Sequence, residues 1–150
     1  MKHMIRFYPY FVVLFRIIIG IVFVYASIDK IIDPAKFARN ISNYHIVPFG
    51  LENIIAIILP WLELLIGMGL ILGLYVDGGT FISAILLIIF NLLVMQAMIR
   101  GYNIECGCGL KEGEMVGWNK IFENFFLLLL SYLIYIRKKY LLEFLPKSAL

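Results

Sequence analysis

The most distinctive chemistry in this sequence belongs to two cysteines separated by one glycine, Cys106 and Cys108. A disulfide between them would close a small ring whose constrained geometry makes the bond easier to reduce. Gly107 and Gly109 supply the backbone freedom that such a ring needs. Closing so short a loop contributes little stability, because the entropic effect grows with loop length. A bond that stabilises little and reduces easily suits thiol–disulfide exchange, so we expect a catalytic redox pair here.

Two other interpretations of the cysteine pair stay open. Two thiolates can hold a soft metal ion such as copper or mercury, and His45 would be a third ligand if it lies on the same side of the membrane. The pair can also be a passive disulfide or two idle thiols. Two cysteines are too few for a disulfide scaffold or a four-ligand zinc site, so no resident metal is predicted.

A second group of candidate residues consists of polar side chains inside long apolar stretches: Arg16, Glu63, Asn91, Glu123 and Asn124. Ionisable residues within a membrane are costly and commonly functional. With a helical rise of about 1.5 Å per residue, these side chains fall in one layer near the middle of the bilayer. We expect Arg16 to pair with Glu63 or Glu123, and Trp61 to line a binding pocket around them. The alternative is that the polar layer only fixes how the helices pack.

The elements that position these residues are predicted to be membrane-spanning helices. The chain has 150 residues, of which 63% are hydrophobic and 15% charged. Soluble domains are nearer half apolar and a quarter charged, which argues against a soluble enzyme, a nucleic-acid-binding module or a disordered chain. A helix needs about 20 mostly apolar residues to span a bilayer, and four stretches qualify: 7–28, 54–76, 80–99 and 118–136. We therefore predict one all-α domain over 1–150, an integral membrane four-helix bundle.

The segment between the first two stretches is predicted to hold a short amphipathic helix. Asp33 followed by Pro34 is typical of a helix N-terminus. Phe37, Ile41 and Tyr44 then form an apolar stripe that suits the membrane surface or the end of the bundle. Lys30, Asp33 and His45 are expected to be surface-loop residues beside it.

Glycine residues predict one site of close helix contact and one tight turn. Gly69 and Gly73 have the spacing that allows close helix contact, either within the chain or in a homodimer. Asp77-Gly78-Gly79 is expected to form the tight turn between the second and third stretches.

The orientation follows from the lysine and arginine residues, although their counts on the two sides are equal. Arg137-Lys138-Lys139 directly adjoins a span, which favours cytoplasmic termini in the inner membrane. The Cys106–Cys108 loop would then face the outside, where thiols can be oxidised. The first stretch is expected to be retained, because Arg16 interrupts it and no small-x-small cleavage pattern precedes Ser27.

Four motifs resemble those of the DoxX-like superfamily and, within it, the MauE-type redox-associated membrane proteins. They are Lys30-Ile31-Ile32-Asp33-Pro34 with Phe37, Tyr44 to Pro48, Pro60-Trp61-Leu62-Glu63 with Gly67, and Cys106-Gly107-Cys108 before the last span. Leu110 stands where the family often has Phe after the loop glycine. Glu123-Asn124 stands where the family often has Arg-Asn.

The resemblance implies a four-helix membrane protein associated with disulfide chemistry in exported proteins. The expected function is thiol–disulfide redox transfer, as a thiol oxidoreductase or a subunit of one. Electrons would pass to a thioredoxin-like protein, another membrane oxidoreductase subunit, or a quinone bound near Glu63, Arg16 and Trp61. The alternatives are a carrier of a soft metal or small sulfur compound, and an assembly subunit without chemistry.

Overall fold

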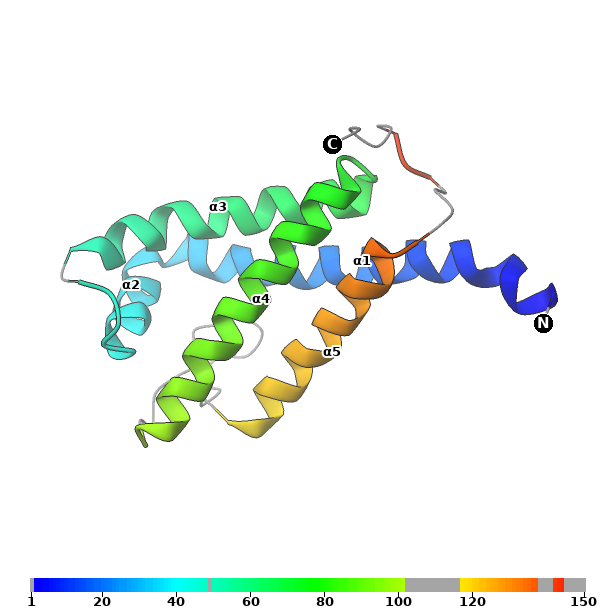
Figure 1. Cartoon of the computed structure of the whole chain (residues 1–150). Coiled ribbons are helices and arrows are strands. Elements are labelled where there is room, and N and C mark those ends of the chain that lie inside the picture. Colours follow the sequence, from blue (N-terminus) through cyan, green and yellow to red (C-terminus); the bar gives the residue numbers. More distant parts are fainter. Residues whose placement is uncertain (1, 49, 102–116, 138–141, 145–150) are drawn as a thin grey trace.

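The computed structural model describes residues 2–48, 50–101, 117–137 and 142–144, with only the backbone described for 2–9. These residues form helices and no strands, so the all-α class is confirmed. The helices are α1 (Lys2–Ile32), α2 (Pro34–Asn43), α3 (Leu51–Leu72), α4 (Val76–Ile99) and α5 (Trp118–Tyr135) (Figure 1).

Three of the helices are long and apolar enough to cross a membrane: Tyr10–Ile32 within α1, Leu51–Leu72 and Val76–Ile99. The chain is therefore a multi-pass membrane protein. The last helix, α5, does not reach the same hydropathy within the described residues. Its first two turns carry Asn119, Lys120, Glu123 and Asn124, which lower its mean hydropathy.

Local sequence explains where the helices break. The Asp33 side chain accepts a hydrogen bond from the Lys36 backbone N–H at 2.8 Å, and Pro34 begins α2. This is an N-cap with proline in the first helical position. The helix that was expected after Asp33 is therefore present, with Phe37 and Ala38 buried against Ala56 of α3.

The turn between α3 and α4 lies earlier than expected. Gly73 has a φ of 79° and Tyr75 a φ of 47°, so the chain reverses over these residues. The Leu74 N–H donates to the Gly69 carbonyl at 2.8 Å and closes the end of α3. The prediction of a turn centred on Asp77-Gly78-Gly79 was wrong, because these residues form the first turn of α4. Helix starts tolerate glycine there, since the first N–H groups have no helical partner.

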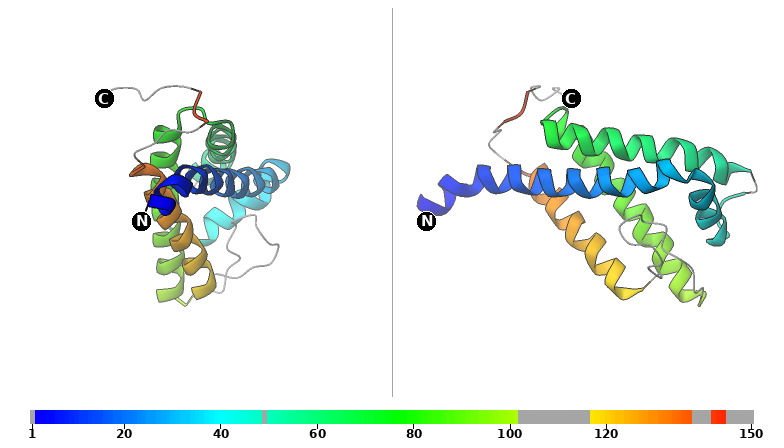
Figure 2. Two further views of the ribbon diagram at one scale, coloured as in Figure 1. Left: turned by 90° about the vertical axis from the view of Figure 1, so that its right-hand side faces the viewer. Right: turned by 180° about the vertical axis from the view of Figure 1, so that it is seen from behind.

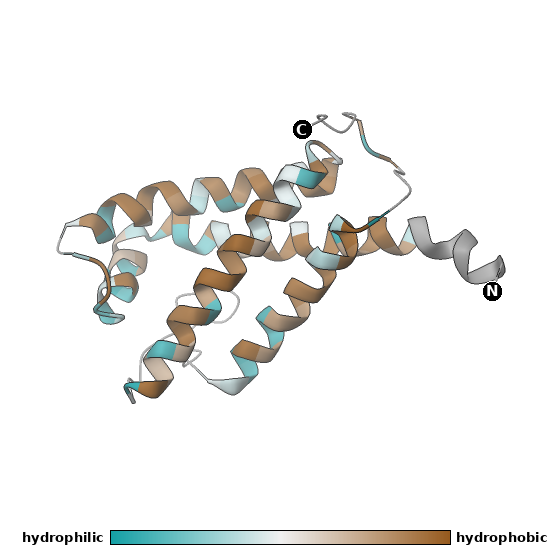
Figure 3. Cartoon of the chain, in the orientation of Figure 1, coloured by the Kyte–Doolittle hydropathy of each residue, from teal (hydrophilic) through white to brown (hydrophobic). Residues whose placement is uncertain are grey.

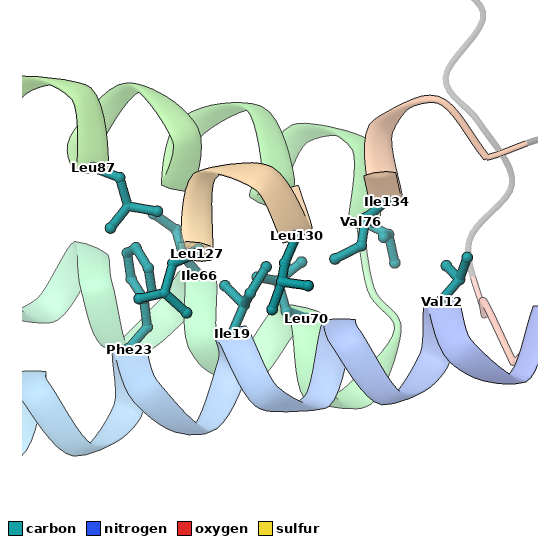
Figure 4. Close-up of a cluster of buried hydrophobic side chains, with 10 residues drawn as sticks. All are labelled: Val12, Ile19, Phe23, Ile66, Leu70, Val76, Leu87, Leu127, Leu130 and Ile134. Atoms are coloured by element: carbon teal, nitrogen blue, oxygen red, sulfur yellow. The ribbon is translucent and has the colours of Figure 1, made fainter. Parts of the chain in front are cut away.

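Two pairs of helices cross to form the body of the protein. In the views of Figures 1 and 2, α1 runs along α3, and α4 lies beside α5. The main core lies where the pairs cross, and all four helices contribute to it. Its buried residues are Val12, Ile19, Phe23, Ile66, Leu70, Val76, Leu87, Leu127, Leu130 and Ile134 (Figure 4).

The helices α1 and α3 approach each other closely at Gly20 and Gly67. A Cβ added to Gly67 would lie 2.8 Å from the Gly20 carbonyl oxygen, and one added to Gly20 would lie 2.6 Å from Ile71 Cγ1. Within the chain, Gly69 and Gly73 do not provide the close contact between helices that was expected of them. Gly73 ends α3, and a Cβ on Gly69 would meet only the Leu74 carbonyl, at 3.3 Å.

Apolar residues dominate the helices, as Figure 3 shows by hydropathy, and many large apolar side chains are exposed. On α3, Ile57, Ile58 and Leu65 are exposed, while on α4 and α5 the polar Ser83 and Ser131 are fully buried. A protein in water has the opposite tendency, because its large apolar side chains are covered. This distribution fits a surface solvated by lipid tails.

A polar cluster ties the end of the chain to the α3–α4 turn. Arg137 pairs with Asp77 at 2.7 Å and with both carboxylate oxygens of Glu143, at 2.7 and 2.8 Å. The Phe144 N–H donates to the Gly73 carbonyl at 3.1 Å. Burial alone would lower the pKa of Arg137, but its hydrogen bond and charge interactions with Glu143, and then Asp77, raise that pKa above the ordinary arginine value. The side chain therefore stays charged.

Arg16 belongs to this end of the protein. The prediction that it pairs with Glu63 or Glu123 was wrong: its Nη2 donates to the Leu142 carbonyl at 3.0 Å. The reason is the register of α1 on α3. Gly20 packs against Gly67, so Arg16 falls beside Gly73, ten residues or about 15 Å beyond Glu63.

Candidate ligand-binding site

The centre of the site is a buried ion pair between α1 and α3. Lys30 Nζ lies 2.8 and 2.7 Å from the two carboxylate oxygens of Glu63. The side chains are only 8% and 12% exposed. Lys30 Nζ also lies 5.0 Å from the centre of the Phe37 ring, a distance at which a cation is attracted to an aromatic face. The prediction that Lys30 is a surface-loop residue was wrong, because α1 continues through it to Ile32.

This ion pair lies on the wall of a cavity between the two helix pairs, with a volume of about 440 Å³. We call it the interhelical cavity. All five helices contribute to its lining, which is largely aliphatic and aromatic. Its charged and amide side chains are Lys30, Asn40, Glu63, Lys120 and Asn124. An apolar cavity with a few polar groups is the usual form of a small-molecule site in proteins.

The α5 wall of the cavity holds a lysine, which is paired with a carboxylate outside the lining, and a buried amide. Lys120 Nζ lies 2.8 Å from Glu123 Oε2, one turn along the helix. The lysine side chain is 1% exposed, whereas Glu123 is 46% exposed. Asn124 is buried, and its Nδ2 has no hydrogen-bond partner among the residues that the structure describes. The sequence indicated Lys30 only as a surface-loop residue and did not single out Lys120, since each stands near a helix end.

The predicted pocket residues are only partly brought together. Glu63 and Asn124 line the interhelical cavity, whereas Arg16, Trp61, Asn91 and Glu123 are not among its lining residues. Trp61 is 55% exposed on the outer surface. Asn91 lies on α4, and its side-chain oxygen is buried without a partner in the described part of the chain. Of the predicted surface residues, Asp33 caps α2, and His45 is exposed just beyond that helix.

Cys106 and Cys108 lie outside the described residues. The described residues that flank their segment are Gly101, just after α4, and Gly117, just before α5. Lys120 and Asn124, in the first two turns of α5, line the interhelical cavity. The segment that carries the cysteines therefore rejoins the fold within two helical turns of the cavity wall.

Comparison with known proteins decides the family. The family model described as "Methylamine utilisation protein MauE" matches residues 8–137. The chain belongs to the MauE family. The MauE part of the resemblance drawn from the motifs is thereby confirmed.

Two named relatives agree with this assignment. The MauE protein "Methylamine utilization protein MauE" of Paracoccus denitrificans is 28% identical over 120 residues, which cover 77% of this chain and 63% of the relative. The protein of the same name from Methylorubrum extorquens is 31% identical over 91 residues, covering 58% of this chain and 49% of the relative. The matches thus span half to two thirds of these MauE proteins. No solved structure matches the chain.

Proposed function

We propose that this MauE-family protein takes part in thiol–disulfide redox transfer at the outer face of the cytoplasmic membrane, through Cys106 and Cys108. The observation that carries the proposal is the Cys-Gly-Cys sequence in the segment joining α4 to α5 of a multi-pass membrane protein. Membership of a family described by methylamine utilisation supports a role in a redox-related pathway.

The proposed step is an exchange of two electrons. The thiolate of one cysteine attacks a partner disulfide and forms a mixed disulfide. The second cysteine then displaces the partner, so the pair becomes a disulfide and the partner leaves as a dithiol. The partner gains two electrons and two protons, and both come from the two protein thiols. A reduced thioredoxin-like protein would return two electrons and two protons to the pair and reset it. With a quinone as acceptor the exchange runs the other way: a partner dithiol reduces the protein disulfide, and the resulting protein thiols pass two electrons and two protons to the quinone, which leaves as a quinol.

The topology that goes with this function has α5 as a fourth span. Its exposed side chains are mainly apolar, among them Phe122, Phe125 and Phe126, and it turns Lys120 and Asn124 inward. This arrangement suits a helix surrounded by lipid whose polar groups are met by protein. Both termini would then be cytoplasmic, and the segment after Gly101 would lie outside.

The test is redox titration of the purified protein in lipid nanodiscs, with thiols trapped by a maleimide and counted by mass. We expect one two-electron couple in the wild type. Cys106→Ser and Cys108→Ser should each abolish the couple while leaving the helix content unchanged. Two thiols that remain reduced, or a disulfide that no dithiol reduces, would refute redox transfer.

A further inference from the structure

We propose that the interhelical cavity binds a neutral, lipid-soluble ring compound with carbonyl oxygens, the chemical class to which quinones belong. Binding of this ligand does not require the cysteines. Only its use as an electron acceptor rests on the function proposed above.

The walls of the cavity select an apolar body. Phe23, Leu59, Leu87, Phe90 and Leu127 line it from four helices, all of them within apolar helices of the bundle. A volume of about 440 Å³ lies within the range of about 300 to 1,000 Å³ that is usual for small-molecule sites. A ligand dissolved in the bilayer would exchange lipid contacts for these side chains.

The charges around the cavity select a neutral ligand. Lys30 is paired with Glu63, and Lys120 is paired with Glu123. An anion would have to compete with a carboxylate for its lysine, and a cation would compete with a lysine for its carboxylate. Removing one partner from a buried ion pair is strongly unfavourable. The paired charges therefore disfavour ionic ligands of either sign.

The hydrogen-bond donors select a ligand with acceptor oxygens. Asn124 Nδ2 is a buried donor that no described residue satisfies, and such a group costs stability until an acceptor meets it. The Lys30 ammonium has three N–H donors, and two of them are given to Glu63. A carbonyl oxygen accepts from such donors without carrying charge. A lipid acyl chain would fill the volume but would leave Asn124 unsatisfied.

The experiment measures binding of 2,3-dimethyl-1,4-naphthoquinone to protein in nanodiscs, with empty nanodiscs subtracted. The matched ligand is 2,3-dimethylnaphthalene, which has the same rings without the oxygens. The protein carries Cys106→Ser and Cys108→Ser, so that thiol chemistry cannot contribute. We expect the quinone to bind at least threefold more tightly than the hydrocarbon, since one or two added hydrogen bonds are gained.

Two pairs of variants locate the site. Asn124→Leu should reduce the preference for the quinone by roughly three- to tenfold. Asn91→Leu, at an amide outside the lining whose side-chain oxygen is buried, should keep the preference. Leu93→Trp fills the cavity and should abolish binding of both ligands. Leu92→Trp adds the same ring on the exposed side of α4 and should leave binding unchanged.

The outcomes separate the alternatives. Equal binding of the two ligands, or an unchanged preference in Asn124→Leu, means that the cavity takes hydrocarbon chains and overturns the proposal. Wild-type binding in Leu93→Trp overturns it as well, because the ligand is then elsewhere. If Asn124→Leu does not fold, the proposal is tested by the two tryptophan variants and by the difference in affinity between the quinone and the hydrocarbon. Binding that succeeds while the redox titration fails would refute only the thiol function.

Discussion

At the scale of single residues, the strongest constraint comes from the buried charges that have an oppositely charged partner at close range. Lys30 with Glu63 and Arg137 with Glu143 are largely buried pairs with distances of 2.7 to 2.8 Å. In such a pair the loss of one partner is more costly than the loss of both, because the remaining charge is left without compensation. This asymmetry gives a direct test of the ion pair on the cavity wall.

We predict that Glu63→Gln destabilises the protein by about 3 to 5 kcal/mol, because Lys30 is left as an uncompensated buried cation. The double variant Lys30→Met with Glu63→Leu should recover most of this loss. Unfolding in mixed micelles measures both. Glu52→Gln on the same helix removes an exposed charge but keeps an oxygen that can accept from the Gly50 N–H, so it should cost about 1 kcal/mol or less. If the double variant were destabilised by the full sum of the two single losses, the Lys30 and Glu63 charges would not be coupled, which would contradict the prediction.

A second residue-scale prediction concerns Arg137. We predict that Arg137→Met costs about 3 to 5 kcal/mol, since Asp77 and Glu143 lose their shared cation. The raised pKa of Arg137 has a defined sign: its stabilisation is complete below the unfolded pKa and is lost only as pH rises through the higher folded value. The cost of Arg137→Met should therefore not diminish between pH 6 and pH 9, which chemical denaturation at several pH values checks. A loss that disappears by pH 9 would contradict a permanently charged Arg137.

At the scale of helices, the register of α1 on α3 depends on the contact between Gly20 and Gly67. Small residues allow the backbones of membrane helices to approach closely, and dispersion forces then hold the helices together. This one contact decides that Lys30 reaches Glu63 and that Arg16 does not.

We predict that Gly67→Ala destabilises the fold by about 1 to 3 kcal/mol through overpacking. The added Cβ would meet backbone of α1, including the Val24 nitrogen at 3.0 Å. Gly78→Ala is the matched control, since a Cβ there has nothing within 4 Å. It should be neutral, or stabilise by up to about 1 kcal/mol because alanine favours helix. Equal effects of the two variants, measured by thermal unfolding in detergent, would show that the contact has no role in packing.

The helices also show which structural features could be predicted from the sequence. Asp33 and Pro34 predicted the start of α2, because a helix cap is a local interaction that short sequence patterns reveal. The pairing of Arg16 was not predictable in this way. It depends on the relative shift of two helices, and depth along each helix was estimated without knowing where α1 and α3 make contact. Because α1 is shifted along α3 by a few turns relative to the predicted alignment, Arg16 lies at the opposite end of the helix pair from Lys30 and Glu63.

At the scale of the whole molecule, the family and its membrane character were accessible from composition and motif order. The interhelical cavity was not, because it arises from the crossing of two helix pairs and includes Lys120, whose burial no local pattern indicates. Glu63 was found because an acid in an apolar stretch is conspicuous, whereas a lysine near a helix end is common.

The proposed topology gives a prediction at this scale. With Cys106 and Cys108 replaced by serine, we introduce Ser42→Cys at the end of α2 or Gly78→Cys beside the α3–α4 turn, both exposed positions. In intact cells a membrane-impermeant maleimide should label the first variant and not the second. Labelling after lysis should be equal, which controls for reactivity. Labelling of the second variant alone in intact cells would reverse the orientation.

The hydrogen bond from Arg16 to the Leu142 carbonyl also bears on how the protein is made. The two residues are 126 positions apart in the chain. At a synthesis rate of about 5 to 20 residues per second, Arg16 leaves the ribosome roughly 6 to 25 s before its acceptor does. During that interval the guanidinium must find temporary partners in the translocation machinery, in water or in lipid head groups. The fold at this end of α1 is therefore completed only after Leu142 has been synthesised.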